Sequence, residues 1–346
     1  MNFLSDNAGP AHPAVLEALV RANDGYARAY GTDDLTEAAR DKLRQVFEAP
    51  DARVEFTASG TAANAMLLAE LTPPWGTVFA TPTAHIEEDE CGAIPFMTGG
   101  AKITLVDGPD GKMDPAALEA ALARYGGPDV HGLARGPVSL TQATEKGTLY
   151  TPAEIKAHAQ IAHRAGVALH MDGARFANAV AATGASPAEL TWRAGVNALS
   201  LGATKNGALG LEAMVVFDPD RAPTLARRQM RAGHLLSKHR YLAAQMLAWL
   251  DDDLWLDLAT RANTACARLA QGLGDKPDVA LQYAPAVNIV FADVPVALHR
   301  QLQVAGARYT VWAGDPDGPD DAALTIRLVC DWSIDPAAVD RFLALF

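Results

Sequence analysis

The chain has 346 residues, of which 49% are hydrophobic and 20% charged, so it carries enough apolar material for at least one large folded domain. Its 29 basic and 41 acidic residues give a net charge of −12, which argues against binding to nucleic acid or to anionic membrane surfaces, because both need clustered positive charge. No apolar run is long enough to span a membrane.

The N-terminal segment and the cysteines predict a cytoplasmic protein. Residues 1–10 lack the basic region and the apolar run of a signal peptide. The three cysteines, Cys91, Cys266 and Cys330, are far apart and odd in number, so we expect neither a disulfide framework nor a metal site. A reducing compartment is the simplest environment for such a chain.

Short apolar runs alternate with amphipathic stretches through the first two thirds of the chain. Predicted strands are, in order, 54–57, 77–80, 102–106, 137–141, 167–171, 196–200 and 213–217. Helical patterns lie between most of them and are clearest at 114–124 and 151–165. In the second, Thr151-Pro-Ala-Glu154 predicts an N-cap followed by a proline and a glutamate in the first turn. This alternation predicts an α/β domain with a mostly parallel, seven-stranded sheet.

The pattern changes after about residue 230. A long helical region runs from about 235 to 273, with a possible break at 251–253. Strand candidates follow at 287–291, 309–312 and 324–328, with helices near 294–305 and 336–345. We therefore predict a large domain at residues 1–250 and a small C-terminal α+β domain at residues 251–346.

A candidate anion site follows the first predicted strand. Ser59, Gly60 and Thr61 stand at the start of a helical stretch that continues from 62 to 71. Backbone N–H groups at a helix N-terminus, with hydroxyls beside them and a glycine that permits close approach, can hold a phosphate. A plain helix cap would use the same residues, so this motif needs support from elsewhere in the chain.

Asp172, Arg175 and Lys205 stand at the ends of two successive predicted strands. Asp172 and Arg175 belong to the segment 170–175, and Lys205 follows the next strand in the segment 200–207. The gap of 205 − 172 = 33 residues is about one strand–helix–strand unit. Because sites of open α/β sheets lie at the carboxyl ends of the strands, we expect the three side chains to face one cleft. Taken singly, Asp172 could be a helix cap and Lys205 a surface residue.

Together these residues predict a site for pyridoxal 5'-phosphate (PLP). A lysine amine forms a Schiff base with this cofactor, and a carboxylate pairs with the pyridinium nitrogen so that the ring can act as an electron sink. The helix N-terminus would receive the phosphate.

The chain resembles the threonine aldolase family, fold type I PLP-dependent transferase-like enzymes that are grouped with β-eliminating lyases. The resemblance spans nearly the whole chain and is carried by the segments 5–10, 30–31, 59–64, 84–86, 140–147, 170–178, 203–207 and 326–329. With Ala-Thr-Lys-Asn-Gly at 203–207, the chain is most similar to the bacterial low-specificity L-threonine aldolases.

The resemblance implies a role toward the cofactor for several residues. Lys205 carries the Schiff base, and Asp172 pairs with the pyridine nitrogen. The Ser59-Gly60-Thr61 turn holds the phosphate. His85 lies over the face of the ring, and Arg175 lies near the phenolate oxygen.

It also implies substrate contacts. Arg327 or Arg175, helped by Ser5, would hold the substrate carboxylate. His131 matches a histidine near the substrate β-hydroxyl, where a base of near-neutral pKa suits cleavage of the carbon–carbon bond. Tyr30 matches a residue near the site, supplied by the same or by another subunit. The predicted catalytic residues are thus Lys205, His85 and His131.

The implied reaction is retro-aldol cleavage of L-threonine, L-allo-threonine and related β-hydroxy-α-amino acids to glycine and an aldehyde. The alternative is another fold type I PLP lyase that catalyses β-elimination, or an enzyme similar to serine hydroxymethyltransferase. The resemblance further implies a homo-oligomer, a dimer or a tetramer, with active sites at subunit interfaces. A basic residue of a neighbouring subunit, either Arg231 or Lys238, would complete the phosphate site.

Overall fold

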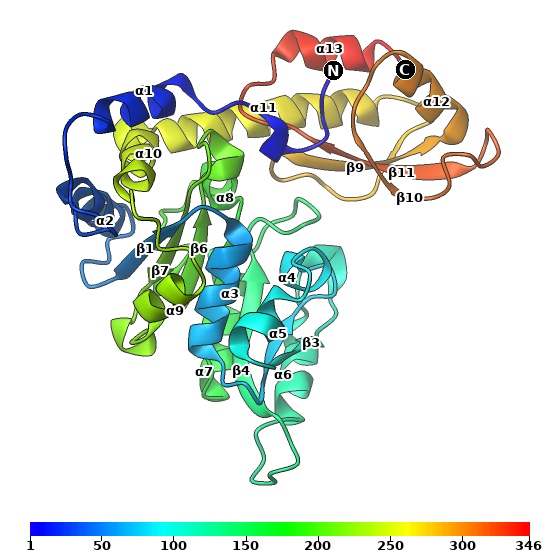
Figure 1. Ribbon diagram of the computed structural model, residues 1–346. Coiled ribbons are helices and arrows are strands. Elements are labelled where there is room, and N and C mark those ends of the chain that lie inside the picture. Colours follow the sequence, from blue (N-terminus) through cyan, green and yellow to red (C-terminus); the bar gives the residue numbers. More distant parts are fainter.

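The computed structural model describes residues 1–346 and contains two β-sheets (Figure 1). The larger sheet has seven strands in the order β1-β7-β6-β5-β4-β2-β3. Its strands are β1 (Arg53–Thr57), β2 (Gly76–Ala80), β3 (Lys102–Leu105), β4 (Ala134–Thr141), β5 (Leu169–Gly173), β6 (Ala198–Gly202) and β7 (Glu212–Val216). Only β7 runs antiparallel to its neighbours, β1 and β6. The predicted mostly parallel, seven-stranded sheet is confirmed.

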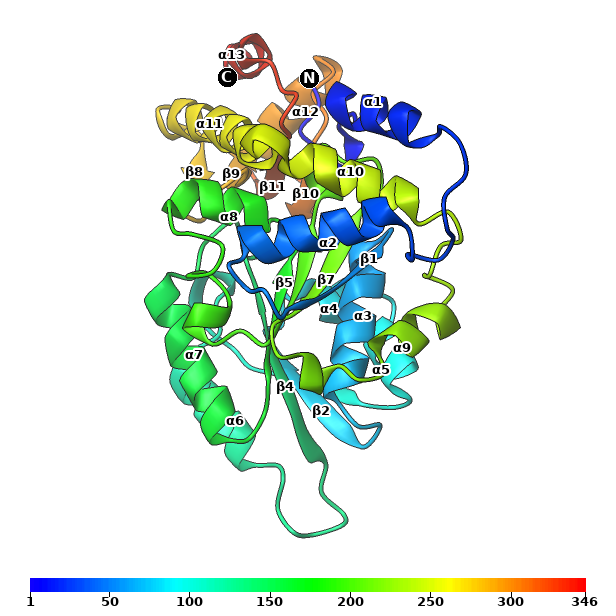
Figure 2. The same ribbon diagram turned by 90° about the vertical axis from the view of Figure 1, so that its left-hand side faces the viewer.

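Helices cover both faces of the large sheet (Figure 2). On one face lie α3 (Gly60–Leu71), α5 (Ala93–Thr98) and α9 (Leu225–Arg231), and α4 (His85–Glu88) follows β2. The other face is covered by α2 (Asp34–Val46), α6 (Pro115–Ala123), α7 (Pro152–Arg164), α8 (Phe176–Thr183) and α10 (Arg240–Leu250), and α1 (Pro13–Ala22) packs on α10. None of the helices combines the length and the apolar character that crossing a membrane requires.

The apolar strands at the centre of the chain account for the core of this sheet. Every residue of β5, β6 and β7 is buried, as expected for strands covered by helices on both faces. The predicted capping box is also present, because Thr151 and Glu154 hydrogen-bond each other's backbone at the start of α7. Local sequence therefore fixes where this helix begins.

The central strands lie about two residues later than their hydrophobicity predicts. We expected strands at 167–171 and 196–200, but β5 and β6 begin at Leu169 and Ala198. Val167 donates its N–H to Ala162 O in the turn after α7, and Val196 donates to Thr191 O. Asp172 instead takes part in the sheet, opposite Thr141 and Ser200. The carboxyl ends of β4, β5 and β6 are therefore aligned at one edge.

The smaller sheet is antiparallel, with the order β10-β11-β9-β8. Its elements are α11 (Leu254–Gly274), β8 (Ala280–Leu281), β9 (Ile289–Pro295), α12 (Val296–Val304), β10 (Thr310–Ala313), β11 (Ala323–Val329) and α13 (Pro336–Leu343). The predicted break at 251–253 is a short 3₁₀ turn between α10 and α11. The predicted small α+β unit is therefore present.

The division between residues 250 and 251 stays a prediction, and two packing contacts qualify it. Helix α11 belongs to both units, because Trp255 and Leu258 pack in the core of the large sheet and Cys266 and Leu269 in that of the small sheet. Phe3 packs against Phe342, with ring centroids 4.9 Å apart. Burial of Phe3 thus holds the first residues of the chain against the small unit, although the predicted division places them with the large domain.

Candidate active site

A cavity of about 360 Å³ lies at the carboxyl edge of β5 and β6, beside the N-termini of α3 and α4. Six residues predicted for the site line it: Ser59, Gly60, Thr61, His85, Asp172 and Lys205. They come from four separate segments of the chain. The expectation that the aspartate and the lysine of successive strand ends share one cleft is thus confirmed.

Lys205 is presented by a 3₁₀ turn, Thr204–Asn206, that follows β6. The Asn206 side chain donates to Trp255 O at 2.8 Å, and Trp249 Nε1 donates to Asn206 O at 2.8 Å. Gly207 ends the turn at φ +92°, where a Cβ would stand 2.7 Å from Leu258 Cδ1, so only glycine suits that position. Burial, and next the Arg175 guanidinium, lower the pKa of Lys205, which favours the neutral, nucleophilic amine.

Asp172 is buried and held in one orientation. Its Oδ2 accepts a hydrogen bond from Asn64 Nδ2 at 2.8 Å, and its Oδ1 accepts the Ala174 N–H at 3.0 Å. Asn64 is oriented in turn by Ser200, whose hydroxyl donates to Asn64 Oδ1 at 2.6 Å. The carboxylate is therefore fixed between α3 and the sheet at the cavity wall.

The N-terminus of α3 opens into the same cavity. Ser59 caps the helix by accepting the Ala62 N–H at 3.3 Å. A Cβ added at Gly60 would meet no atom within 4 Å, so there is open space beside the first backbone N–H groups. A helix N-terminus, a fixed carboxylate and an amine of lowered pKa are the groups that the phosphate, ring nitrogen and aldehyde of PLP require. The residues present therefore fit this cofactor.

His85 is held by a buried glutamate. His85 Nδ1 lies 2.9 Å from Glu90 Oε1, which also accepts a hydrogen bond from Asn64 Nδ2 at 2.9 Å. The hydrogen bond with Glu90 raises the pKa of His85, and burial raises the pKa of Glu90. The backbone N–H of His85 donates to Glu145 Oε1 at 3.0 Å. His85 is thus held in the cavity by two acidic residues, Glu90 through the imidazole and Glu145 through the backbone.

The two predicted arginines differ in their partners. Arg175 forms a two-pronged ion pair with buried Asp6, at 2.7 Å from Nε and 3.0 Å from Nη2. Burial alone would raise the pKa of Asp6, but Arg175 and Lys205 outweigh it and hold that pKa below its usual value. Arg327 makes no ion pair, and its Nε is buried without a partner. Ser5 caps the turn that carries Asp6, by accepting the Asn7 N–H at 3.1 Å.

The structure does not bring His131 to the cavity of its own chain. This residue precedes β4, whereas the cavity lies beyond the other end of that strand, where Thr141 pairs with Asp172. The 141 − 134 = 7 residue steps of β4 correspond to roughly 23 Å at the usual rise of a strand. His131 is exposed in the loop that projects at the bottom of Figure 1 and pairs only with Asp129. Its predicted place near the substrate β-hydroxyl therefore stays a prediction.

Tyr30 also lies outside the cavity of its own chain. It is exposed in the loop between α1 and α2, at φ +57°, and its N–H donates to Ser237 O. The predicted phosphate partners Arg231 and Lys238 are exposed as well, and neither lines the cavity. Lys205 is the one cationic side chain that does.

Four buried acids near the site were not singled out from the sequence: Asp6, Glu90, Glu145 and Glu212. Burial raises the pKa of Glu145 and of Glu212 to about 7. Glu212 was detectable in principle, because it is the one charged residue of the apolar strand β7, and a buried charge in such a strand is rare without a function. Nothing local marks Glu90, whose partners come from α3 and α4.

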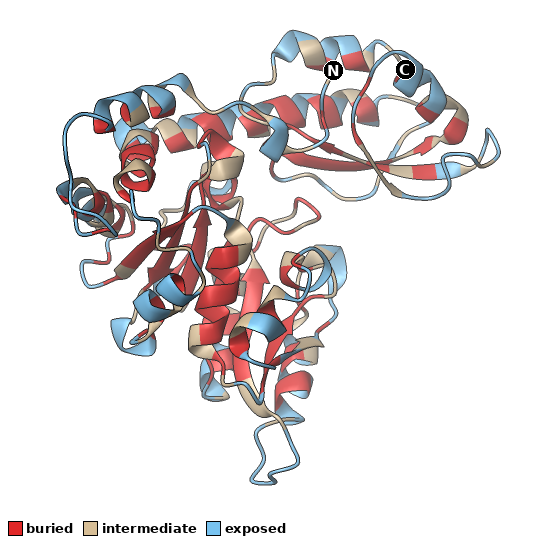
Figure 3. Ribbon diagram, viewed as in Figure 1, coloured by how far each residue is buried: buried red, intermediate tan, exposed pale blue.

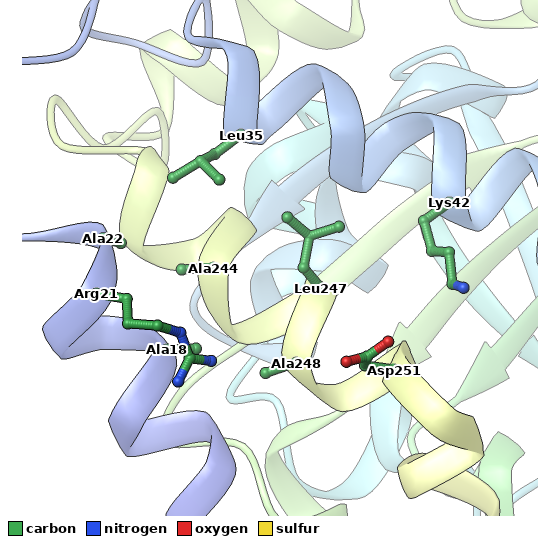
Figure 4. Close-up of a pocket in the computed structure, with 9 residues that line it drawn as sticks. All are labelled: Ala18, Arg21, Ala22, Leu35, Lys42, Ala244, Leu247, Ala248 and Asp251. Carbon is green, nitrogen blue, oxygen red and sulfur yellow. The ribbon is translucent and has the colours of Figure 1, made fainter.

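A second cavity of about 380 Å³ lies between α1, α2 and α10 (Figure 4). Its walls are mainly alanine and leucine, with Arg21, Lys42 and Asp251 among the lining residues. It contains no histidine, cysteine or hydroxyl side chain. We therefore place the chemistry at the carboxyl edge of the large sheet.

This fold and this site define a PLP-dependent enzyme of fold type I. The comparisons with known proteins agree: the beta-eliminating lyase family model matches residues 2–297, and the chain belongs to that family. A low specificity L-threonine aldolase of Pseudomonas aeruginosa is 41% identical over 96% of this chain and 93% of that protein. Another, of a Pseudomonas species, is 38% identical over 99% of this chain and 96% of its own.

A solved structure extends the likeness to three dimensions. The threonine aldolase of Leishmania major superposes with a TM-score of 0.92 at 26% identity, covering 99% of this chain and 98% of that one. The chain is therefore a lyase of the PLP-dependent class.

Proposed function

We infer that this protein cleaves L-threonine, L-allo-threonine and related β-hydroxy-α-amino acids to glycine and an aldehyde. The observation that carries the inference is that Lys205 and Asp172 line the same cavity, in a chain 41% identical to a low specificity L-threonine aldolase. The alternative activities, β-elimination and hydroxymethyl transfer, have no comparable support among these relatives.

Lys205, Asp172 and the N-terminus of α3 would hold the cofactor. PLP, when bound, supplies a sink for the electrons released as the Cα–Cβ bond breaks. Asp172, fixed by Asn64, would lie beside the pyridine nitrogen, where a carboxylate favours the protonated form of that nitrogen. With the cofactor bound, the substrate amine would replace the amine of Lys205 on the cofactor, and Lys205 would take the cofactor back after the reaction, which its lowered pKa assists.

Arg327 is the residue we propose for the substrate carboxylate. It is a half-buried cation without an ion-pair partner and with an unused buried donor, and a bidentate carboxylate would satisfy it. Two N–H donors of Arg175 already bind Asp6, so we assign Arg175 to the part of the site that would hold the phenolate oxygen of the cofactor. Holding the carboxylate fixes which bond of Cα stands perpendicular to the ring and thereby selects the bond that is cleaved.

His85 is the nearest imidazole to the reacting atoms. We propose that its ring lies over the cofactor face and exchanges the proton of the substrate β-hydroxyl, directly or through one water. Glu90 anchors Nδ1, which leaves Nε2 for the reaction. With His131 at the far edge of the sheet, no other histidine lines the cavity.

We further propose a homo-oligomer whose sites need residues of a second subunit. The open end of α3 has no cation beside it except Lys205, so a phosphate dianion there lacks the partner that Arg231 or Lys238 of another subunit would supply. The large apolar side chains of Tyr26, Tyr30 and Leu209 are more than half exposed. Such exposure is expected of a contact surface between subunits.

Mixing variants tests the shared site. Lys205→Ala and Tyr30→Ala subunits, each inactive alone, would regain about a quarter of wild-type activity after exchange, because about half of the dimers are mixed and each mixed dimer carries one intact site of two. No recovery after confirmed subunit exchange would rule out a contribution of Tyr30 from a second subunit. For the compartment, we propose the cytoplasm, which the three free cysteines support.

The activity is tested by absorbance and product assay on the purified protein. Holoenzyme should show the visible band of a PLP Schiff base, and L-allo-threonine should yield acetaldehyde and glycine in equal amounts. Pyruvate or ammonia in place of acetaldehyde would assign the protein to β-elimination. Failure to take up PLP would contradict the cofactor-binding roles proposed for Lys205 and Asp172.

A further inference from the structure

Lys146 has an environment that the reaction as described above does not use. It lies in the loop between β4 and α7, most of which is buried (Figure 3). Its side chain has no carboxylate within ion-pair distance and no hydrogen-bond partner in the chain. Burial lowers the pKa of Lys146, while the carboxylates of Glu88 and Glu145, which lie beyond ion-pair distance, raise it. Because no carboxylate contacts this largely buried side chain, its charge needs another source of stabilisation.

Three aromatic rings of the small unit supply it. The Nζ of Lys146 lies 4.6 Å from the ring centroid of Trp312, 5.1 Å from Phe291 and 5.8 Å from Tyr283. The rings themselves meet edge to face, at 5.2 Å for Phe291 with Trp312 and 5.6 Å for Tyr283 with Phe291. These three rings, called the aromatic cage below, attract a cation through their π faces.

The aromatic cage also contacts Arg327. The guanidinium carbon of Arg327 lies 5.3 Å from the Trp312 ring, and in the small sheet Arg327 is directly opposite Phe291. Directly opposed residues of an antiparallel pair lie on the same face of the sheet. Lys146 and Arg327 are therefore two unpaired cations that share one tryptophan.

The loop of Lys146 is joined to both parts of the site. On one side, Glu145 accepts the backbone N–H of His85 at 3.0 Å. On the other, Gly147 O accepts the Ala286 N–H at 3.1 Å. Gly147 has φ +77°, and a Cβ there would stand 2.9 Å from Ile289 O, so the loop lies directly against the small unit. Lys146 thus stands between the residue that anchors His85 and the sheet that carries Arg327.

We propose that Lys146 is a positioning residue for the substrate carboxylate. By occupying the aromatic cage, its ammonium fixes Trp312 against Arg327 and docks the small unit on the loop that holds His85. Its charge also adds to the positive potential that a carboxylate meets at Arg327. The inference rests on the proposed role of Arg327 and extends it to a residue that never touches the substrate.

The test compares two amines that bind the holoenzyme. Glycine carries the carboxylate and methylamine lacks it, and the change in cofactor absorbance gives a dissociation constant for each. We expect Lys146→Met to weaken glycine binding about tenfold and methylamine binding less than about twofold. Lys146→Arg, which keeps a cation in the cage, should restore most of the affinity for glycine. In turnover, KM should rise for Lys146→Met while kcat changes little.

Further variants make the outcome decisive. Trp312→Phe, which keeps a weaker ring in the aromatic cage, replaces Lys146→Met as the test if that variant folds poorly. It should also weaken glycine binding more than methylamine binding, but by a smaller factor. Lys112→Met is the matched control, because Lys112 lies 5.8 Å from the Tyr150 ring and pairs with Glu154 away from the cavity; it should change neither constant.

Arg327→Gln separates the two levels of the proposal. If it weakens glycine and methylamine alike, the carboxylate role of Arg327 is wrong and the inference falls with it. In the other outcome, Arg327→Gln weakens the binding of glycine alone while Lys146→Met weakens the binding of both amines equally, or of neither. In that case only the positioning role of Lys146 is overturned.

Discussion

Two histidine–carboxylate pairs of this molecule have similar distances and very different surroundings. His85 lies 2.9 Å from Glu90 and His131 lies 2.7 Å from Asp129. In the first pair the side chains are 38% and 0% exposed, and in the second 89% and 70%. The first stands at the edge of the sheet with Lys205, and the second precedes β4 at the opposite edge.

The difference shows that distance alone does not define a functional pair. Water and salt screen an exposed pair, which contributes little. The buried pair belongs to a network that continues from Glu90 through Asn64 to Asp172, where low dielectric strengthens each hydrogen bond. Variants at the two ends of the strands therefore test whether the two pairs differ in function.

The largest effect is expected at Lys205. Lys205→Ala should lower kcat/KM on the order of 10⁴-fold or more, because the amine that exchanges with the substrate is gone. Acetaldehyde release from L-allo-threonine measures it, and loss of the Schiff-base absorbance should accompany it. Lys156→Ala, at an exposed position of α7, is the control. Substantial turnover in Lys205→Ala would sink the assignment.

Asp172→Asn should have the next largest effect. The neutral amide cannot keep the pyridine nitrogen protonated, so kcat should fall roughly 10²- to 10³-fold, as for loss of one preorganised electrostatic contact. Steady-state kinetics with saturating PLP measures the change. Asp129→Asn, the same substitution at the other edge of the sheet, should leave kcat/KM as it is. A normal rate in Asp172→Asn would falsify its pairing with the ring nitrogen.

Removing the partner of His85 should have a moderate effect. Glu90→Gln replaces the carboxylate whose hydrogen bond raises the pKa of His85 by a neutral amide, so His85 should release its proton at lower pH than in the wild-type protein. The rate should fall on the order of tenfold, less than the loss of about 10²-fold or more that removal of an acid–base group itself brings. An NMR titration of the His85 ring measures the pKa, and an unchanged pKa would show that Glu90 does not control it.

The last prediction concerns the stability of the folded protein at different pH values rather than its rate. Burial raises the pKa of Glu145 from 4.5 to about 7, so the folded protein holds this proton more tightly than the unfolded chain. Its stabilising contribution is complete below pH 4.5 and is lost as pH rises to about 7, because the folded state must then keep an ionised, buried carboxylate.

Glu145→Gln removes that penalty and can still accept the His85 N–H. Unfolding of the apoprotein in denaturant should show the variant more stable than wild type at pH 8, by up to about 3 kcal/mol, with the difference shrinking toward pH 5. A difference that does not depend on pH would mean that Glu145 is ionised in both states. Glu154→Gln, which removes an accessible carboxylate of the capping box, serves as the control for surface titration.

Much of the fold was predictable because it rests on local patterns. The alternation of apolar runs and amphipathic stretches placed six strands of the large sheet within about two residues and missed the first three residues of β4, and Thr151 and Glu154 marked the start of α7. The offsets at β5 and β6 arose because turn hydrogen bonds held Val167 and Val196 outside the sheet. Phe3 joined the small unit through a contact with Phe342, which no local pattern contains.

Sequence spacing alone predicted the reactive pair. Asp172 stands near the end of one parallel strand and Lys205 just after the next, and parallel strands bring their carboxyl ends to one edge. The surroundings of the pair depend on the tertiary fold. Asp6 meets Arg175 across 169 residues of chain, and Asn64 meets Asp172 across 108. It also separated His85 from His131 and enclosed Lys146 in three rings of the other unit. Burial and partner geometry arise from contacts distant in sequence, and these set the charge state of each group.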